Sequence, residues 1–203
     1  MVFDSEAAFE DAVVEALCSY GWGDVDDVIV RPTEQELIDN WAAILFDRNK
    51  HRDRLNGVPL SDTEMAQIMG QIQTLRTSLA LSKLINGEEI IITRDSADDD
   101  LHRGKSVALK IFDPDEIAGG SSRYQVVRQP VYAAKSKLGH DRRGDLMLLI
   151  NGMPLFHIEL KKSGVPVGDA AGQIEKYAKE GVFSGLFSLV QVFVAMNPDQ
   201  TRY

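Results

Sequence analysis

Three charged residues, Asp145, Glu159 and Lys161, stand at the two ends of an otherwise apolar stretch. Side chains alternate along a β-strand, so Glu159 and Lys161 would share one face. Two carboxylates and the backbone carbonyl of Leu160 would form a set of hard oxygen ligands suited to Mg²⁺ or Mn²⁺. Such an ion acidifies the water that it binds, and an adjacent ammonium offsets charge on a phosphate, so the pattern is typical of phosphodiester hydrolysis.

The connection in the middle of this stretch decides whether the two acids meet. A two-residue turn at Asn151-Gly152 would place Asp145 opposite Ile158, with Glu159 on the other side. A three-residue connection would place Asp145 opposite Glu159, with Cβ atoms roughly 5 Å apart. The Asn-Gly pair favours the short turn. The chemistry requires the longer connection, or a bulge that corrects the register.

The same residues also have a purely structural interpretation, in which Glu159 and Lys161 form an ion pair at a strand end. If Asp145 and Glu159 do meet, repulsion between them raises one pKa or recruits a cation. Gln173 and Tyr177 lie one helical turn apart, beginning twelve residues after Lys161. A helix there would lay an amide and a phenol over the site. The alternative is a half-buried tyrosine beside a solvent-exposed glutamine.

The elements around these residues predict an α/β fold. Both apolar strands are hydrophobic on both faces, which implies helical layers on both sides of a sheet. Pro130 indicates a bulge or an edge position within its strand, and Asp169 is expected to cap the last helix. The patterns predict helices over 5–20, 33–50, 61–84 and 168–182 and strands over 106–113, 124–133, 145–150, 154–161 and 187–196.

Charge and cysteine content limit the possible partners and cellular environment of the protein. The net charge of −9 argues, taken alone, against nucleic acid. Bases nevertheless gather in residues 135–143 and 161–162, either as a basic rim beside a carboxylate site or as solvated loops. The single Cys18 cannot form an internal disulfide. Because we find neither a signal peptide nor a membrane-spanning apolar run, we expect a soluble cytoplasmic protein with no membrane partner.

Asp145, the Glu-Leu-Lys of residues 159–161 and the "QIEKY" of residues 173–177 resemble the PD-(D/E)xK nuclease superfamily, in its branch with a Gln-xxx-Tyr motif. More closely, the whole chain resembles the N-terminal nuclease part of the R (restriction) subunit of type I restriction-modification enzymes. The resemblance extends over "SEAAFEDAVVEAL", "LSDTEMAQIM", "KLINGEEIIITRD" and "RGDLMLLINGMPLFHIELKKS". Gly144 stands where the superfamily name has Pro.

This resemblance implies a restriction-endonuclease-like core, with a central mixed sheet flanked by helices and an N-terminal helical elaboration. It implies one nuclease domain over 1–203, with a helical part over about 1–90 and a catalytic core over about 100–196. Asp145, Glu159 and the Leu160 carbonyl would bind Mg²⁺, and Lys161 would activate or steady the attacking water. Gln173 and Tyr177 would position the substrate, and an acid of the first helix, Glu6 or Glu10, would also reach the metal.

The implied activity is Mg²⁺-dependent cleavage of double-stranded DNA far from the recognition site, after ATP-driven translocation. In this family the ATP motor lies C-terminal to the nuclease, so ATP would act only in the full-length subunit. The "HRGKS" of residues 102–106 lacks the first glycine of a phosphate loop, so no cofactor-binding residue is expected here. Partners would be the motor domains and the modification and specificity subunits. Two alternatives remain: a non-catalytic module that docks DNA or subunits, and a free-standing repair or defence nuclease.

Overall fold

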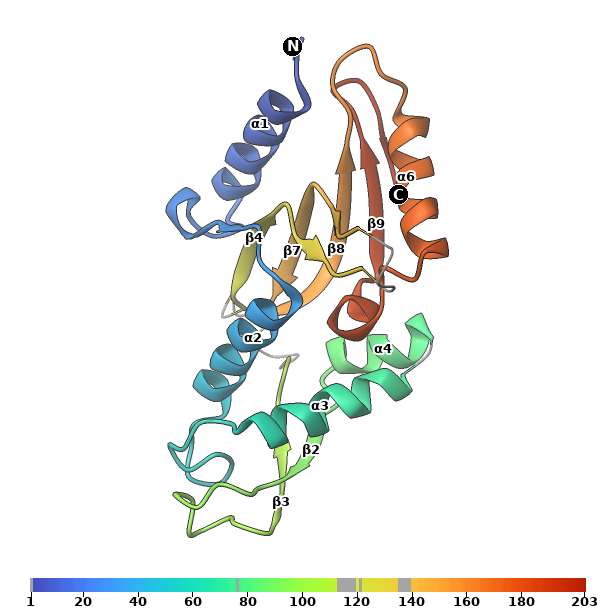
Figure 1. Cartoon of the computed structure of the whole chain (residues 1–203). Coiled ribbons are helices and arrows are strands. Elements are labelled where there is room, and N and C mark those ends of the chain that lie inside the picture. The colour runs from blue at the N-terminus through green and yellow to red at the C-terminus, as the bar shows by residue number, and fades with distance from the viewer. Residues whose placement is uncertain (1, 76, 113–119, 121, 135–139) are drawn as a thin grey trace. The chain divides into compact units, whose positions relative to one another are not determined.

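The computed structural model describes residues 2–75, 77–112, 120, 122–134 and 140–203 (Figure 1). The chain divides into two compact units, one formed by Met1–Leu37 with Arg123–Tyr203 and the other by Ile38–Ser122. The first helix belongs to the unit that holds the main sheet, and not to a separate helical part over about 1–90 as the resemblance implies. Among the described residues, no helix is long and apolar enough to cross a membrane.

The first unit is built on a six-stranded mixed sheet with the strand order β1-β4-β7-β8-β9-β10. Strands β4, β7 and β8 are antiparallel neighbours, and β8 is parallel to β9. A helix, α6, connects these two parallel strands, which makes a βαβ crossover. The strands are β1 (Ile29–Val30), β4 (Tyr124–Arg128), β7 (Leu146–Ile150), β8 (Met153–Leu160), β9 (Val192–Met196) and β10 (Thr201–Arg202).

Two helices cover opposite faces of this sheet (Figure 1). On one face, α1 (Glu6–Ser19) packs Phe9 and Val14 against the even-numbered residues of the hairpin, Leu146, Leu148, Ile158 and Leu160. On the other face, α6 (Val167–Lys179) packs Val167 and Ala170 against Ala195. The predicted burial of the β7–β8 hairpin on both faces is therefore confirmed. Side chains alternate, so the odd-numbered residues, His157 and Glu159 among them, lie on the α6 face.

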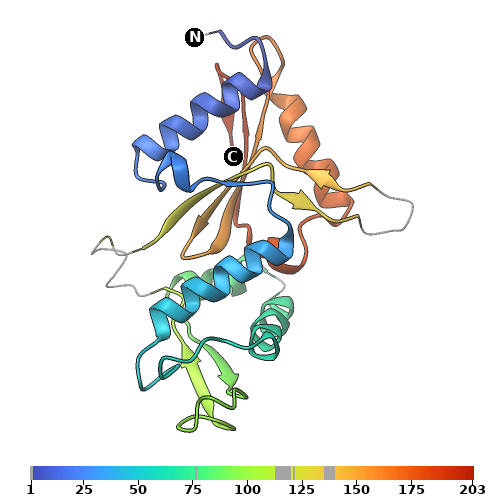
Figure 2. The same cartoon turned by 60° about the vertical axis from the view of Figure 1, so that its left-hand side comes forward.

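The β4–β7 pair continues past a bend into a two-stranded ribbon of β5 (Val131–Tyr132) and β6 (Arg142–Arg143), which Figure 2 shows beside the main sheet. At the bend, the Gln129 N–H donates to the Asp145 carbonyl at 2.7 Å, and the Gly144 N–H donates to the Pro130 carbonyl at 3.2 Å. Gln129 has φ 52°, which turns the chain out of the sheet. The expected irregularity at Pro130 is this bend, and Asp145 lies directly on it.

The second unit contains most of α2 (Glu34–Asn49), then α3 (Asp62–Thr74), α4 (Ser78–Ile85) and the antiparallel pair β2 (Ile90–Thr93) and β3 (Ser106–Leu109). Glutamine side chains on α3 hydrogen-bond the backbone of β2, which holds the helix on the strand edge. The β3 strand ends four residues before the predicted limit, and residue 113 lies outside the described residues.

Helix ends in the structure test several predictions. Capping boxes stand at the starts of α2 and α3, at Thr33/Glu36 and Ser61/Glu64. The prediction of a single helix over 61–84 is wrong. The helix is interrupted between α3 and α4, and the Thr77 hydroxyl accepts from the Ala80 N–H as the N-cap of α4. The prediction of Asp169 as N-cap is also wrong. Helix α6 begins at Val167, so Asp169 lies inside the first turn, where its charge complements the helix dipole.

A fully buried network of charges lies in the second unit. Arg94 is completely buried, and its guanidinium contacts Glu64 Oε2 at 2.5 Å and Asp99 Oδ2 at 3.1 Å, both carboxylates being buried as well. It also donates to the Val58 carbonyl at 3.0 Å. The Asn56 amide donates to Asp99 at 3.1 Å, and the Asp95 N–H donates to Glu64 at 2.8 Å. These bonds tie the loops around α3 and β2 together.

Candidate active site

The β7–β8 hairpin combines the short turn with a correcting bulge. Ile150 pairs with Met153 around the two-residue turn Asn151-Gly152, whose φ angles of 52° and 81° suit a type I′ turn. The register then shifts between Leu148 and Leu149, so that Leu146 pairs with Ile158. The extra residue lies on β8, and it moves the following residues by one position. The next position along this register places Asp145 opposite Glu159.

Asp145 is held at the edge of β8 by backbone hydrogen bonding. The Leu160 N–H donates to Asp145 Oδ2 at 2.7 Å. Burial raises the pKa of Asp145 to about 7, and the charge of Glu159 adds to this rise, while the Leu160 N–H and Lys161 oppose it. Burial likewise raises the pKa of Glu159 to about 7, against the opposing effects of Asp145 and Lys161. The register of the hairpin and the bond from the Leu160 N–H therefore bring Asp145 to the position opposite Glu159, which is the pairing that the chemistry requires.

Glu159 is fully buried, and neither of its carboxylate oxygens has a hydrogen-bond partner among the described residues. His157 Nε2 lies 2.9 Å from Glu159 Oε1 but out of line for a hydrogen bond. A buried carboxylate without donors is costly unless it is protonated or meets a cation. The electrostatic environment of Glu159 thus favours a bound positive charge.

Lys161 lies directly beside these acids, at the end of β8. Its side chain is 14% exposed, and Nζ donates to the Leu160 carbonyl oxygen at 3.0 Å. The same ammonium lies 3.2 Å from Glu6 Oε1 on α1. Glu10, the second candidate acid of the first helix, instead pairs with Arg128 at 2.7 Å. Of the two first-helix acids, the structure brings only Glu6 into contact with Lys161.

Helix α6 presents Gln173 and Tyr177 together on the same face of the sheet. The Gln173 amide donates to the Tyr177 hydroxyl at 3.0 Å, and this hydroxyl donates to the Arg143 carbonyl at 2.9 Å. Burial raises the pKa of Tyr177, and the charge of Glu159 raises it further, so the phenol stays protonated. Tyr177 therefore joins α6 to the ribbon just before Asp145.

An open cavity of about 390 Å³ lies over these two residues. Arg142 and Lys176 supply positive charge at its wall, and Arg142 also pairs with Glu180 at 2.8 Å. Of the basic stretch predicted over 135–143, residues 135–139 lie outside the described residues. The remaining lining residues are Asp169, Gly172, Gln173 and Tyr177.

Two contributors to the site are not predicted by the sequence analysis, Tyr132 and Gly144. The Tyr132 hydroxyl lies 2.9 Å from Nδ1 of the fully buried His157. A Cβ added to Gly144 would lie 2.7 Å from His157 Cε1 and 3.0 Å from Tyr132 Oη, so glycine is needed for this close approach. In the sequence, Gly144 stands out only as a departure from the superfamily pattern. Tyr132 gives no signal in the sequence, because its position depends on the bend before β5.

These residues fit a divalent cation. The fully buried Glu159 carboxylate, the half-buried Asp145 carboxylate and the Leu160 carbonyl oxygen are hard ligands, and the Glu159 oxygens lack any other partner among the described residues. The described part of the chain contains no group of three or more His, Cys, Asp and Glu side chains arranged to hold a metal. The protein would therefore contribute two carboxylates and one carbonyl, with water completing the ligand set.

The raised pKa values predict how stability depends on pH in the absence of divalent cations. Both carboxyl groups bind protons more tightly in the folded chain than in the unfolded chain, where their pKa values lie near 4. Their contribution to stability is therefore complete below about pH 4 and is lost as pH rises to about 7. We expect the double variant Asp145→Asn/Glu159→Gln to gain on the order of 2 kcal/mol over the wild type between pH 5 and pH 8.

Urea unfolding of both proteins at the two pH values measures this difference. Glu175→Gln removes an exposed acid from α6 and should leave the pH dependence unchanged. Parallel pH profiles for the wild type and the double variant would contradict the proposed convergence of the two carboxyl groups.

Comparison with known proteins assigns the family. The family model described as "Type I restriction enzyme R protein N terminus" matches residues 4–203. The endonuclease subunit of the type I restriction enzyme SsaAORF53P from Staphylococcus saprophyticus is 33% identical over 207 residues, which cover 100% of this chain and 20% of that subunit. The corresponding SauMSSORF170P subunit from Staphylococcus aureus is 30% identical over 203 residues, with the same coverage of 100% and 20%.

A third relative, the endonuclease subunit of EcoprrI from Escherichia coli, is 42% identical over 84 residues, which cover 40% of this chain and 26% of that subunit. This chain spans about 20% of the length of the two staphylococcal subunits. The family match extends over almost the whole chain, including α1, both units and the hairpin that carries the candidate site. The protein belongs to the family of the N-terminal region of type I restriction enzyme R proteins.

Proposed function

We propose that this chain is a PD-(D/E)xK endonuclease domain of a type I restriction subunit, and that it cleaves phosphodiester bonds of double-stranded DNA with Mg²⁺ or Mn²⁺. The observation that carries this proposal is the hairpin register that places Asp145 opposite Glu159, whose buried oxygens have no hydrogen-bond partner among the described residues. The names of the relatives, all endonuclease subunits of type I restriction enzymes, support the same activity.

The roles of the residues follow from their positions. Asp145, Glu159 and the Leu160 carbonyl would hold the cation, which would polarise the scissile phosphate and acidify the attacking water. Lys161 would orient that water and offset developing charge, since its ammonium is fixed by the Leu160 carbonyl. Glu6 would hold the ammonium from the opposite side.

DNA would lie across the face that α6 covers. Tyr177 is anchored to the Arg143 carbonyl and accepts from the Gln173 amide, which leaves the amide oxygen of Gln173 for a substrate contact. The cavity above these residues has basic groups at its wall, Arg142 and Lys176, suited to the phosphates of a DNA strand. These local bases would provide the attraction that the net charge of −9 does not.

The remainder of the activity would reside outside this chain, which spans about 20% of its staphylococcal relatives. We propose that ATP is hydrolysed by motor domains of the full-length subunit, which deliver DNA to this site by translocation. Modification and specificity subunits would complete the complex and select the recognition sequence. Cleavage by this chain alone is therefore not required by the proposal.

Titration with Mn²⁺ distinguishes the nuclease from a non-catalytic docking module. We expect this chain to bind Mn²⁺ saturably, and Glu159→Gln to weaken the affinity more than about 100-fold, since a ligand should matter more than a residue that only supports one. Asp169→Asn, which changes an exposed acid at the wall of the cavity, should leave the affinity within about threefold of wild type. Electron paramagnetic resonance of free Mn²⁺ gives the dissociation constants. A wild-type chain that binds no Mn²⁺ would support the docking module.

A further inference from the structure

His157 is a buried polar residue that the proposed mechanism does not use. It lies on β8 two residues before Glu159, on the same face of the strand, and is fully buried. Its Nδ1 lies 2.9 Å from the Tyr132 hydroxyl. Its Nε2 lies 2.9 Å from Glu159 Oε1 and has no hydrogen-bond partner among the described residues. The imidazole thus stands between a phenol and the carboxylate proposed as a ligand.

The ring of His157 is held in place by its neighbours. Cε1 lies so close to Gly144 that an added Cβ would be 2.7 Å away. The rings of Phe183, Tyr177 and Phe193 surround it, with centroids at 5.0, 6.4 and 6.2 Å. Because these contacts come from β6–β7, α6, the loop after α6 and β9, the imidazole cannot swing away without disturbing the packing. A fixed ring is a suitable support for a carboxylate that must keep one orientation.

The contacts of the two ring nitrogens also determine where the proton lies. Nε2 faces a Glu159 oxygen at 2.9 Å, and when Glu159 is ionised to bind a cation two acceptors at that distance would repel one another, so the proton then lies on Nε2. Nδ1 is then an acceptor, and the Tyr132 hydroxyl is its donor at 2.9 Å. Tyr132 therefore selects the tautomer that can donate to Glu159.

We propose that His157 is a positioning residue for Glu159, with its Nε2–H donating to Oε1 and leaving the other carboxylate oxygen for the cation. The proposal rests on the proposed role of Glu159 as a ligand. Nε2 and Oε1 are within hydrogen-bond distance but out of line for a hydrogen bond in the absence of a cation. Contacts of this kind commonly tighten only when the site is loaded. A hydrogen-bond donor to a metal-ligating carboxylate orients that carboxylate and tunes the affinity of the site for the metal.

Three variants of this chain test the proposal by Mn²⁺ affinity. His157→Phe keeps a ring and removes the donor, so we expect Mn²⁺ affinity to fall about 10–100-fold. His157→Gln places an amide N–H near the position of Nε2 and should restore the affinity to within about threefold. Glu175→Gln changes an exposed acid on α6 away from the imidazole, and it should leave Mn²⁺ affinity within about threefold of wild type. A folded His157→Phe chain with wild-type Mn²⁺ affinity would overturn the proposal.

A spectroscopic measurement on the wild type does not depend on the folding of a variant. We expect ¹⁵N NMR of the histidines to show His157 as the Nε2-protonated tautomer, with an Nε2 shift that changes in Glu159→Gln. An Nδ1-protonated ring would overturn the proposal. If the wild type binds Mn²⁺ and Glu159→Gln does not, while His157→Phe binds normally, only the positioning role fails. If the wild type binds no Mn²⁺, the positioning role and the proposed function both fail.

Discussion

Replacing Lys161 with alanine in the complete restriction complex is expected to lower the rate of DNA cleavage by about 10²–10⁴-fold, while DNA-stimulated ATP hydrolysis continues at the wild-type rate. The ammonium of Lys161 is positioned by the Leu160 carbonyl at 3.0 Å and by Glu6 at 3.2 Å, directly beside Asp145 and Glu159. Removing it takes away the cation that would orient water and offset charge at the phosphate. The motor would be untouched, because it would lie outside this chain.

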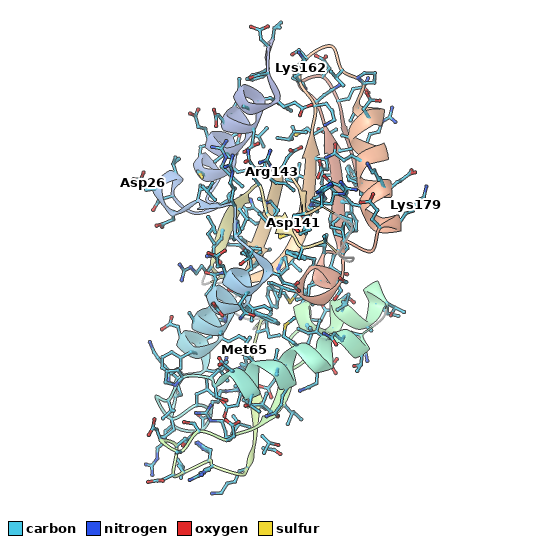
Figure 3. The ribbon with its side chains drawn as sticks, viewed as in Figure 1. Asp26, Met65, Asp141, Arg143, Lys162 and Lys179 are labelled. Atoms are coloured by element: carbon cyan, nitrogen blue, oxygen red, sulfur yellow. The ribbon has the colours of Figure 1, made fainter. Side chains whose placement is uncertain are left out.

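The adjacent lysine provides a matched control. Lys162 is exposed and donates to the Asp4 carbonyl at 3.3 Å, and Figure 3 shows it beside the N-terminal segment, at the opposite end of α6 from Lys179. Lys162→Ala should therefore change the cleavage rate by less than about threefold, the effect of one exposed charge. The cleavage rate with ATP and a substrate that carries the recognition site is measured alongside ATP consumption. Wild-type cleavage by Lys161→Ala would contradict the role given to the ammonium.

Replacing Arg94 with methionine is expected to cost about 3–5 kcal/mol of stability in the second unit. The guanidinium contacts Glu64 and Asp99, and all three side chains are completely buried. Methionine occupies a similar volume but leaves two carboxylates in the interior without their cation. Glu64 also completes the capping box of α3 with Ser61, so the disturbance would reach the helix start.

An exposed ion pair supplies the comparison for this loss. Lys50 pairs with Asp47 at 2.7 Å, with side-chain exposures of 53% and 74%. Lys50→Met should change the free energy of unfolding by less than about 1 kcal/mol, because exposed pairs contribute little. Urea unfolding of the three proteins measures both effects, and a loss of cooperative unfolding in Arg94→Met would be the strongest form of the expected result. Equal stabilities of the two variants would contradict the importance of the buried network.

The hairpin shows how far local sequence patterns predict a site. The apolar segments predicted two adjacent strands, and Asn151-Gly152 predicted the short turn, which the structure confirms. The short turn alone would have separated Asp145 from Glu159. The bulge after Pro154 restores the pairing, and the sequence analysis left it as one of two alternatives. Whether a strand bulges depends on packing against both faces of the sheet, which local patterns do not encode.

The second unit shows where periodicity is insufficient. Apolar residues continue at helical spacing from α3 into α4, so the pattern predicts one helix where the structure has two. The signal that was available is Thr77, which caps α4 through the Ala80 N–H. The partners of Arg94 lie 30 and 5 residues away in the sequence, at Glu64 and Asp99. Contacts that join distant segments in this way arise only once the chain has folded.

The contacts of His157 likewise come from tertiary structure. Its parity with Glu159 puts both residues on one face of β8, where their side chains approach to 2.9 Å. The Tyr132 hydroxyl satisfies Nδ1 of this buried ring. It is the bend at Gln129–Pro130 that brings Tyr132 and Gly144 to the ring. Strand parity can assign a face, but not the residues that other segments bring to that face.

Anomalous X-ray diffraction from crystals of this chain soaked in Mn²⁺ tests most directly whether Asp145 and Glu159 hold a cation together. We predict an anomalous peak within about 2.1 Å of a carboxylate oxygen from each residue and of the Leu160 carbonyl oxygen, the distance expected for a small divalent ion. The peak should be absent from Glu159→Gln crystals grown and soaked in the same way. Well-ordered Mn²⁺ bound elsewhere, with no peak between the two carboxylates, would contradict the proposed active site.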